Sequence, residues 1–305
     1  PHHISMIERV GQRLADFDVV HFHIDLFHYP VVHSWDTPTV TTLHGRLDIP
    51  ELYDCYGVFR DVPLVSISNN QRLPLPPVNW VGNIYHGLPA DLLPYNETGG
   101  DHLVFLGRIS PEKRPDRAIE IAVRSGRRLI MAAKIDDVDR AYWESEIRPL
   151  VEQHEQISFI GEVNEQQKAE LLGNAGALLF PIDWPEPFGL VMIEAMSCGT
   201  PVVAWQNGSV REVMEDGVSG RVVDSMDEAV AAVDDVLGMD RAKVRSYFEE
   251  RFTVQRMASD YVRLFEELID KPRGGEAMPD ARIPRHTPTP PFARKPKGLG
   301  IATAA

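Results

Sequence analysis

The chain has 305 residues, of which 43% are hydrophobic and 25% are charged. This composition excludes a fibre, a mini-protein and a disordered chain, and it suits about two domains. Its 45 acidic and 31 basic side chains give a formal net charge of -14, so no chain-wide field attracts nucleic acid or anionic lipid. We therefore expect no nucleic-acid partner, and local groups must hold any anionic ligand.

Two further features place the chain in a cellular setting. Cys55 and Cys198 lie far apart, which predicts neither a disulfide framework nor a thiolate metal cage and fits the reducing cytoplasm. No apolar run approaches the roughly 18 residues of a membrane-spanning helix. The chain opens on Pro1, and residues 1–10 show no signal-peptide pattern, so we expect the sequence to start inside a gene.

Short apolar runs alternate with longer amphipathic segments, a pattern typical of βα units and parallel sheets. Residues 1–10 predict a helix. Strands are then predicted at residues 17–23, 40–43, 64–66 and 81–85, and, after a turn-rich segment at 96–100, at 103–106, 129–133, 157–160, 177–181, 201–204 and 221–223. Helices are predicted at residues 115–124, 138–151, 165–172, 226–237, 241–251 and 254–269.

This order predicts an α/β protein with two doubly wound domains. We expect a partial domain at residues 1–95, because only four strands are visible there, and a complete domain of six strands at residues 96–253. Residues 254–270 form a closing helix. Residues 271–305 are rich in Pro, Gly and basic side chains and are expected to be a disordered tail.

The segment 185–194 carries the strongest chemical signal. It follows a predicted buried strand, and its helix is expected to begin near Phe188 or Gly189. The first N–H groups of a helix lack intrahelical partners and, with the helix dipole, form a site for phosphate. A glycine at 189 removes the side chain that would block close approach of a ligand.

Two carboxylates bracket this expected phosphate site. Glu186 lies on the loop before the helix, and Glu194 lies more than one turn inside it. A nucleotide sugar offers sugar hydroxyls, a diphosphate and ribose hydroxyls over a comparable length. The alternative is that Glu186 favours the helix dipole and that Glu194 is simply solvated.

Two cations follow the strand at residues 103–106, at the sheet edge where open α/β sheets bind ligands. After Gly107, Arg108 offers a planar fork for phosphate oxygens and Lys113 offers a mobile point charge, so together they are suited to neutralise a departing diphosphate. The alternative is a solvated loop in which both side chains pair with Glu112.

With these motifs the chain resembles the retaining glycosyltransferases of family 4, also called glycosyl transferases group 1, which have the GT-B fold. That family repeats Gly-Arg-(short loop)-Lys and Glu-(seven residues)-Glu in its C-terminal domain, and residues 208–220 match its Gly-x-x-x-Glu-(loop)-Gly-x-x-Gly pattern. The resemblance implies two Rossmann-like domains facing across a cleft, with a closing helix that returns toward the first domain. It also implies transfer of a sugar from a nucleotide-diphosphate sugar to an acceptor hydroxyl with retention of configuration.

Carried over by position, the resemblance implies that Arg108 and Lys113 bind the donor diphosphate, Glu186 contacts sugar hydroxyls and Glu194 holds the ribose. His44, in a segment that resembles the family's first-domain strand tip, is expected to face the donor sugar. Glu186, Arg108, Lys113 and His44 form the expected catalytic set. The expected donor-binding residues are Gly107, Phe188, Gly189, Leu190, Val191, Glu194, Gly161, Glu162, Val163 and Lys134.

Some of these roles stay open. The residues at 161–163 match a loop that touches the base, mostly through its backbone, or they form a plain strand-to-helix connection. Lys134 either reaches a phosphate or sugar oxygen or pairs with Asp136 or Asp137. No carboxylate is placed on the opposite sugar face, so we expect front-side transfer without a metal or a cofactor.

Two alternatives come from other functional classes. His21, His23 and Asp25 imitate a metallo-hydrolase cluster, although Leu26 stands where a partner histidine is usual. The family's first strand and glycine-rich loop are not found, so a fragment that binds nucleotide sugar without turnover is the second alternative. The acceptor is left open among a sugar, a lipid-linked sugar and a small molecule, as is contact with a membrane surface.

Overall fold

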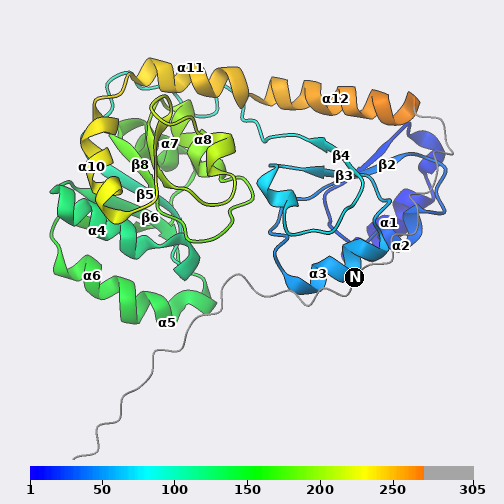
Figure 1. Cartoon of the computed structure of the whole chain (residues 1–305), viewed down its shortest axis with the longest axis horizontal. Coiled ribbons are helices and arrows are strands. Elements are labelled where there is room, and N and C mark those ends of the chain that lie inside the picture. The colour runs from blue at the N-terminus through cyan, green and yellow to red at the C-terminus, as the bar shows by residue number, and fades with distance from the viewer. Residues whose placement is uncertain (271–305) are drawn as a thin grey trace, which may run out of the picture.

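The computed structural model describes residues 1–270, which form two separate parallel sheets with helices packed around them (Figure 1). The predicted tail at residues 271–305 lies outside the described residues. The first sheet has the order β1-β2-β3-β4 and consists of β1 (Val20–Phe22), β2 (Thr39–Thr42), β3 (Leu64–Ser66) and β4 (Trp80–Asn83). The second sheet has the order β10-β9-β8-β5-β6-β7 and consists of β5 (Leu103–Arg108), β6 (Leu129–Lys134), β7 (Ile157–Gly161), β8 (Ala177–Phe180), β9 (Val202–Trp205) and β10 (Gly220–Val223).

The helices connect these strands and close the chain. They are α1 (His2–Gly11), α2 (Tyr29–Val32), α3 (Pro50–Val58), α4 (Pro115–Ser125), α5 (Arg140–Tyr142), α6 (Arg148–Gln153), α7 (Glu165–Asn174), α8 (Leu190–Ser197), α9 (Val210–Val213), α10 (Met226–Leu237), α11 (Arg241–Arg251) and α12 (Val254–Asp270). The predicted α/β fold class is therefore confirmed, and each predicted strand is present with bounds shifted by at most a few residues.

The second sheet has the doubly wound order, in which the chain first builds outward through β6 and β7 and then returns to the other side of β5 with β8. Side chains alternate between two buried layers. Leu178 of β8 belongs to the core beneath α7, α8 and α11, whereas its neighbour Leu179 belongs to the core beneath α4 and α10. The direction reverses between β5 and β8, and the carboxyl ends of these two strands form the crevice where such sheets bind ligands.

The helix predicted at residues 138–151 is present, but it is not α-helical throughout. The structure has a 3₁₀ turn at Asp137–Asp139, then α5, a π-helical segment at Trp143–Ile147, and then α6. Pro149 accounts for the change of pitch, because proline has no N–H to donate to the preceding turn and its ring crowds the carbonyl there. The hydrophobic period alone does not reveal this change of pitch.

The chain crosses between the two sheets twice, and the two crossings pair with each other. The amide of Leu88 donates to the carbonyl of Phe252 at 2.8 Å, and the amide of Val254 donates to the carbonyl of Leu88 at 2.9 Å. Beyond this point α12 packs on the first sheet through Leu264 and Leu268. Figure 1 shows α11 and α12 following one another along one side of the molecule.

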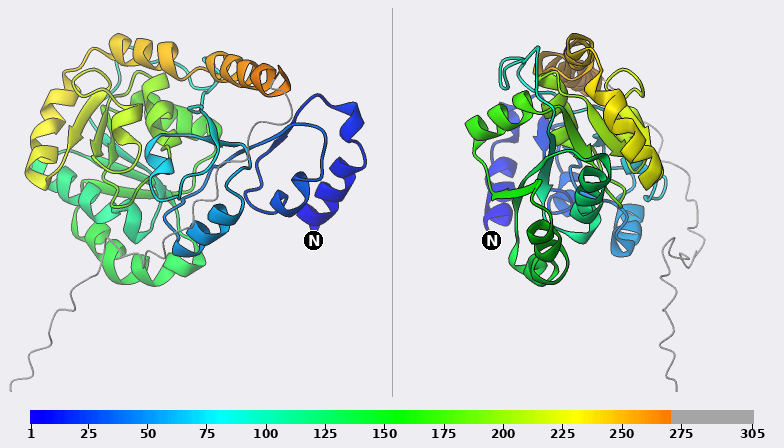
Figure 2. Two further views of the ribbon diagram at one scale, coloured as in Figure 1. Left: turned by 45° about the vertical axis from the view of Figure 1, so that its right-hand side comes forward. Right: turned by 90° about the vertical axis from the view of Figure 1, so that its left-hand side faces the viewer.

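We call β1–β4 with α1–α3 and α12 the first lobe, and β5–β10 with α4–α11 the second lobe. The views in Figure 2 place α1 at the end of the first lobe that is remote from the second sheet. Away from the crossings, Glu212 of the second lobe accepts from the amides of Asn69 and Asn70 at 2.6 and 2.7 Å, and from the Tyr85 hydroxyl at 3.1 Å. This carboxylate therefore links the two lobes through several hydrogen bonds.

Candidate functional site

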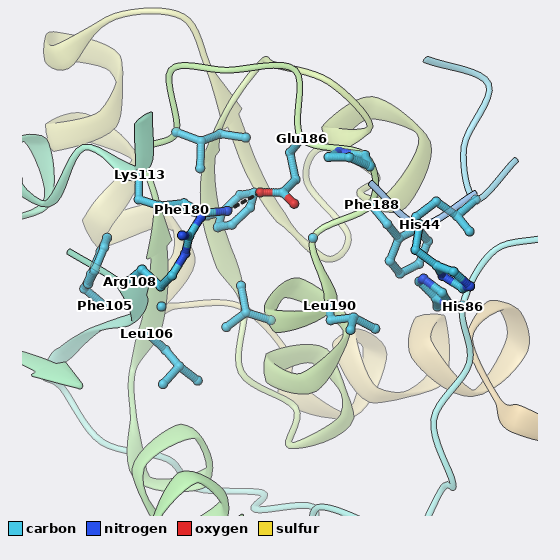
Figure 3. A pocket seen from close by; sticks show the side chains of 16 residues that line it. His44, His86, Phe105, Leu106, Arg108, Lys113, Phe180, Glu186, Phe188 and Leu190 are labelled. Atoms are coloured by element: carbon cyan, nitrogen blue, oxygen red, sulfur yellow. Dashed lines mark hydrogen bonds and ion pairs between the residues drawn. The ribbon is translucent and has the colours of Figure 1, made fainter. Parts of the chain in front are cut away.

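A cavity of about 330 Å³ lies between the lobes, at the carboxyl ends of β5 and β8 (Figure 3). Its volume falls within the range of roughly 300–1,000 Å³ that is usual for small-molecule sites. The predicted residues that line it are His44, Gly107, Arg108, Lys113, Glu186, Phe188, Gly189, Leu190 and Val191. The predicted residues that do not line it are Gly161, Glu162, Val163, Lys134 and Glu194.

Lys113 and Glu186 form an ion pair beside this cavity, drawn as the dashed line in Figure 3. The two side chains are only 17% and 12% exposed, so water screens their attraction less than that of a surface pair. Trp184 also donates its indole N–H to Glu186, at 3.1 Å. The alternative pairing of Lys113 with Glu112 is therefore wrong: the partner comes from a loop 73 residues further along the chain.

Arg108 is held less tightly. Its guanidinium lies 3.4 Å from Glu112 and 3.5 Å from Asp136, and the side chain is 47% exposed. Such long, exposed pairs contribute little, so Arg108 is available to an anion in the cavity. Lys134 pairs with Asp136 at 2.6 Å, which selects the pairing alternative among the expectations for this lysine.

Helix α8 begins at Leu190, one or two residues later than predicted, because Gly189 is its N-cap and adopts the left-handed conformation with φ of 81°. A Cβ on Gly189 would lie 2.6 Å from Met192 and 3.1 Å from Phe180. The left-handed turn and the packing against Phe180 thus both favour glycine at this position. At Gly107, by contrast, no atom lies within 4 Å of the Cβ position, so that glycine does leave the cavity wall open.

The loop that carries Glu186 is tied down by the segment 207–209. The amide of Ser209 donates to the carbonyl of Glu186 at 3.0 Å, and the Ser209 hydroxyl donates to the carbonyl of Phe188 at 2.8 Å. Asn207 donates from its side-chain amide to the carbonyl of Ile182 at 3.0 Å. The start of the motif at residues 208–220, together with the preceding Asn207, therefore has a structural role, because it holds the Glu186 loop in place.

Glu194 has a partner that the sequence did not indicate. Lys168 of α7 donates to Glu194 at 2.7 Å, and both side chains are 15% exposed. Lys168 also lies 3.0 Å from Glu165, which is far more exposed. A lysine inside an amphipathic helix is usually solvated, and only the packing of α7 against α8 reveals this contact.

Histidines form the wall of the cavity on the first lobe. His44 is hydrogen-bonded to His23 at 2.7 Å, and its ring stacks on His86 with centroids 5.3 Å apart and planes 7° apart. His86 in turn meets the ring of Phe188 edge to face, at 5.0 Å. His86 lines the cavity but was not predicted, because it lies on the crossing segment and outside every motif.

The rival metal site is not formed. His21 is hydrogen-bonded to Thr42 at 2.7 Å and His23 to His44, while Asp25 lies on an exposed turn with φ of 52°. Nowhere in residues 1–270 do three His, Cys, Asp or Glu side chains lie where they can hold one metal ion. The hydrolase alternative therefore has no geometric support.

The electrostatics of the histidine cluster predict a pH effect on stability. Burial lowers the pKa of His86 to about 4 and that of His21 to about 3, with nearby ring charges adding to the effect, and it also lowers the pKa of His44. Below pH 6.5 these histidines bind protons in the unfolded chain but stay largely neutral in the folded protein. The free energy of unfolding should therefore fall as pH drops from about 6.5 toward 4.

Urea unfolding at pH 7, 6 and 5 measures this effect, with His86→Asn as the test variant. The charges nearest to His86 are those of His44, His23 and Arg256, and all of them remain in this variant. Its unfolding free energy should depend less steeply on pH than that of the wild type, whereas the same change at the exposed His2 should leave the slope as it was. Equal slopes in wild type and His86→Asn would refute the assignment.

Comparison with known proteins shows the family of this chain. The family model described as glycosyl transferases group 1 matches residues 96–252. The D-inositol 3-phosphate glycosyltransferase of Mycolicibacterium smegmatis is 33% identical over 128 residues, which is 41% of this chain and 29% of that protein. The phosphatidyl-myo-inositol mannosyltransferase of Mycobacterium leprae is 40% identical over 78 residues, which is 26% of this chain and 21% of that protein. The matched regions thus cover less than half the length of these relatives.

Solved structures show a similar fold. HepE of Anabaena, determined in complex with UDP, matches with a TM-score of 0.74 and 17% identity over 86% of this chain and 82% of its own. AviGT4, a glycosyltransferase involved in avilamycin A biosynthesis, matches with a TM-score of 0.67 and 24% identity over 86% of this chain and 78% of its own. The family match spans more than half of the chain, and the protein therefore belongs to the glycosyl transferases group 1 family and has a GT-B fold.

Proposed function

We propose that this protein transfers a sugar from a nucleoside-diphosphate sugar to an acceptor hydroxyl. One observation carries the proposal: Arg108, Lys113 and the N-terminus of α8 line the same cavity, at the switch point of the second sheet. Two cations and the unpaired amides at the start of a helix are groups that bind diphosphate. The family match and the solved neighbour that binds UDP support a nucleotide-sugar donor.

The donor is proposed to lie along α8. Its diphosphate meets Arg108, Lys113 and the backbone of residues 188–190, and its sugar hydroxyls meet Glu186 on one side and His44 on the other. The nucleoside extends past the cavity, where Glu194 receives the ribose and the loop 161–163 receives the base. From Gly189 to Glu194 a helix rises by roughly 7–8 Å, which suits the step from phosphate to ribose.

The proposed reaction retains the anomeric configuration by front-side transfer. The bond from the anomeric carbon to the diphosphate oxygen breaks, a bond to the acceptor oxygen forms on the same face, and the acceptor's proton passes to the leaving diphosphate. Arg108, Lys113 and the helix amides stabilise the charge that develops on the leaving group. We favour this route over covalent attack by Glu186.

The remaining elements of the proposal follow from the same chemistry. Protein cations supply the positive charge at the diphosphate, so the step is proposed to need neither a metal ion nor a cofactor. The acceptor is a hydroxyl compound: a sugar, a lipid-linked sugar or a small molecule. Cys55 and Cys198 are both free, which supports a cytoplasmic setting. No helix within residues 1–270 has the length and hydropathy that a bilayer crossing takes.

Calorimetry with UDP-glucose, GDP-mannose and ADP-glucose tests the proposal. We expect at least one of these donors to bind to the wild type, and Arg108→Ala to weaken that binding by roughly tenfold to a hundredfold, since charged hydrogen bonds contribute about 1.5–3 kcal/mol. Arg124→Ala is the matched control, because Arg124 pairs with Glu120 on the surface of α4. It should bind the donor as the wild type does.

The outcomes separate the candidate functions. Release of nucleoside diphosphate in the presence of hydroxyl acceptors supports transfer, whereas binding without any product selects the alternative of a nucleotide-sugar-binding protein. If no nucleotide sugar binds, or if Arg108→Ala binds its donor as tightly as Arg124→Ala does, the proposed function is wrong.

A further inference from the structure

Trp184 lies at the centre of a set of contacts that the family motifs do not contain. It belongs to the loop between β8 and α8 and is half-buried. Its carbonyl accepts from the amide of Glu186 at 2.8 Å, which makes a tight turn around Pro185. Because the segment 207–209 ties down the following residues of this loop, the indole is presented on a fixed backbone.

The indole N–H of Trp184 donates a hydrogen bond to one oxygen of the Glu186 carboxylate, Oε2. Both Trp184 and Lys113 donate to Oε2. In the described part of the chain no hydrogen bond reaches Oε1, and Figure 3 shows the second carboxylate oxygen turned away from Lys113. The carboxylate is therefore held by one oxygen and offers the other as an acceptor.

The face of the same indole contacts Lys113, the other member of the ion pair with Glu186. The ammonium of Lys113 lies 4.8 Å from the centroid of the Trp184 ring, within the range of a cation–π interaction, and 5.8 Å from that of Phe180. One side chain thus contacts both Glu186 and Lys113, the two groups proposed to meet the sugar and the diphosphate. Loss of the ring would therefore remove one contact from each of them.

The ring of Trp184 also reaches the first lobe. The guanidinium carbon of Arg46 lies 5.6 Å from the centroid of the ring, and Asp48 fixes that guanidinium with two hydrogen bonds of 2.7 Å. Arg46 follows His44 by two residues, so this contact forms where the first lobe meets the cavity. The indole therefore contacts residues of both lobes: Arg46 of the first lobe, and Lys113 and Glu186 of the second.

We propose that Trp184 is a positioning residue, which orients Glu186 so that Oε1 faces the donor sugar and keeps Lys113 beside it. The inference rests on the proposed function. It adds a residue-level requirement: an aromatic ring is not sufficient at position 184, because the indole N–H fixes which oxygen of Glu186 is free. A ring that merely filled space would be replaceable by phenylalanine without loss of turnover.

Trp184→Phe tests this requirement, because phenylalanine keeps an aromatic face and removes the N–H. We expect kcat for sugar transfer to fall by about tenfold or more, with a smaller change in KM for the donor. Trp205→Phe is the matched control: its ring also packs against an arginine, Arg117, at 4.8 Å, but the contacts that Trp184 makes with Glu186 and Lys113 have no counterpart there.

A double-mutant cycle with Glu186→Gln shows whether Trp184 acts through that carboxylate. In the Glu186→Gln background, Trp184→Phe should have little further effect on kcat. If Trp184→Phe does not fold, Trp184→Leu takes its place: it removes both the N–H and the ring, and kcat should fall at least as far. A wild type that neither binds nor turns over a nucleotide sugar overturns the proposed function. An active wild type whose Trp184→Phe variant matches Trp205→Phe in kcat and in KM for the donor overturns only the role of Trp184.

Discussion

Lys113→Met is expected to lower kcat for sugar transfer by about a hundredfold to a thousandfold, the usual loss when one group that stabilises developing charge is removed. The ammonium lies in the cavity wall beside Glu186, and it is the less exposed of the two cations there. Methionine keeps most of the length and the contact with the ring of Trp184, so the change removes the charge and little packing. Steady-state kinetics with the donor found by calorimetry measures the loss.

Two further variants show whether the loss of kcat in Lys113→Met comes from the missing charge. Lys113→Arg keeps the charge but changes its geometry, so partial activity is expected. Lys243→Met makes the same substitution at an exposed position on α11 and should leave kcat unchanged. If Lys113→Met retains the kcat of Lys243→Met, the charge of Lys113 has no part in the reaction.

Gly208→Ala is expected to abolish most activity and to destabilise the protein. Gly208 has φ of 57°, and a Cβ there would lie 2.3 Å from the amide nitrogen of Glu186 and 2.4 Å from its carbonyl oxygen. Backbone strain alone costs about 1–3 kcal/mol, and the clash adds to it by pushing the Glu186 loop away. Thermal unfolding and kcat measured on the same preparation should both decline.

Gly126→Ala is a control that separates the effect of backbone strain from the effect of the steric clash at Gly208. Gly126 ends α4 with φ of 68°, but no atom lies within 4 Å of its Cβ position. The control therefore has a similar backbone strain and no contact with the Glu186 loop. Equal stability and equal kcat in the two alanine variants would show that the close packing of Gly208 on Glu186 does not matter.

The sequence predicted the parts of this molecule that local rules determine. The strand–loop–helix pattern around Glu186 follows from a buried apolar run, two prolines and a glycine, and the structure places that loop at the cavity. The strand predicted at residues 103–106 is also present, but it runs two residues further, so Gly107 and Arg108 belong to the end of β5. In a doubly wound sheet, topology alone brings these two strand ends together.

The features that could not be predicted from the sequence are contacts between segments that lie far apart in the chain. Nothing local indicates that Lys113 pairs with Glu186 or that Lys168 pairs with Glu194, because those pairs depend on how loops and helices pack. His86 was missed for the same reason: it belongs to a crossing between lobes and to no motif. The start of α8 was predicted one or two residues too early. Gly189 is in the left-handed conformation, so the first helical residue is Leu190.

The central claim is that a diphosphate binds where the two cations meet the start of α8. A crystal structure of the protein soaked with the donor that calorimetry identifies tests it most directly. We predict phosphate oxygens within hydrogen-bond distance of Arg108, Lys113 and the amides of residues 189–190, with Glu186 turned to the sugar. A donor bound on another surface, with this cavity empty, would contradict the claim.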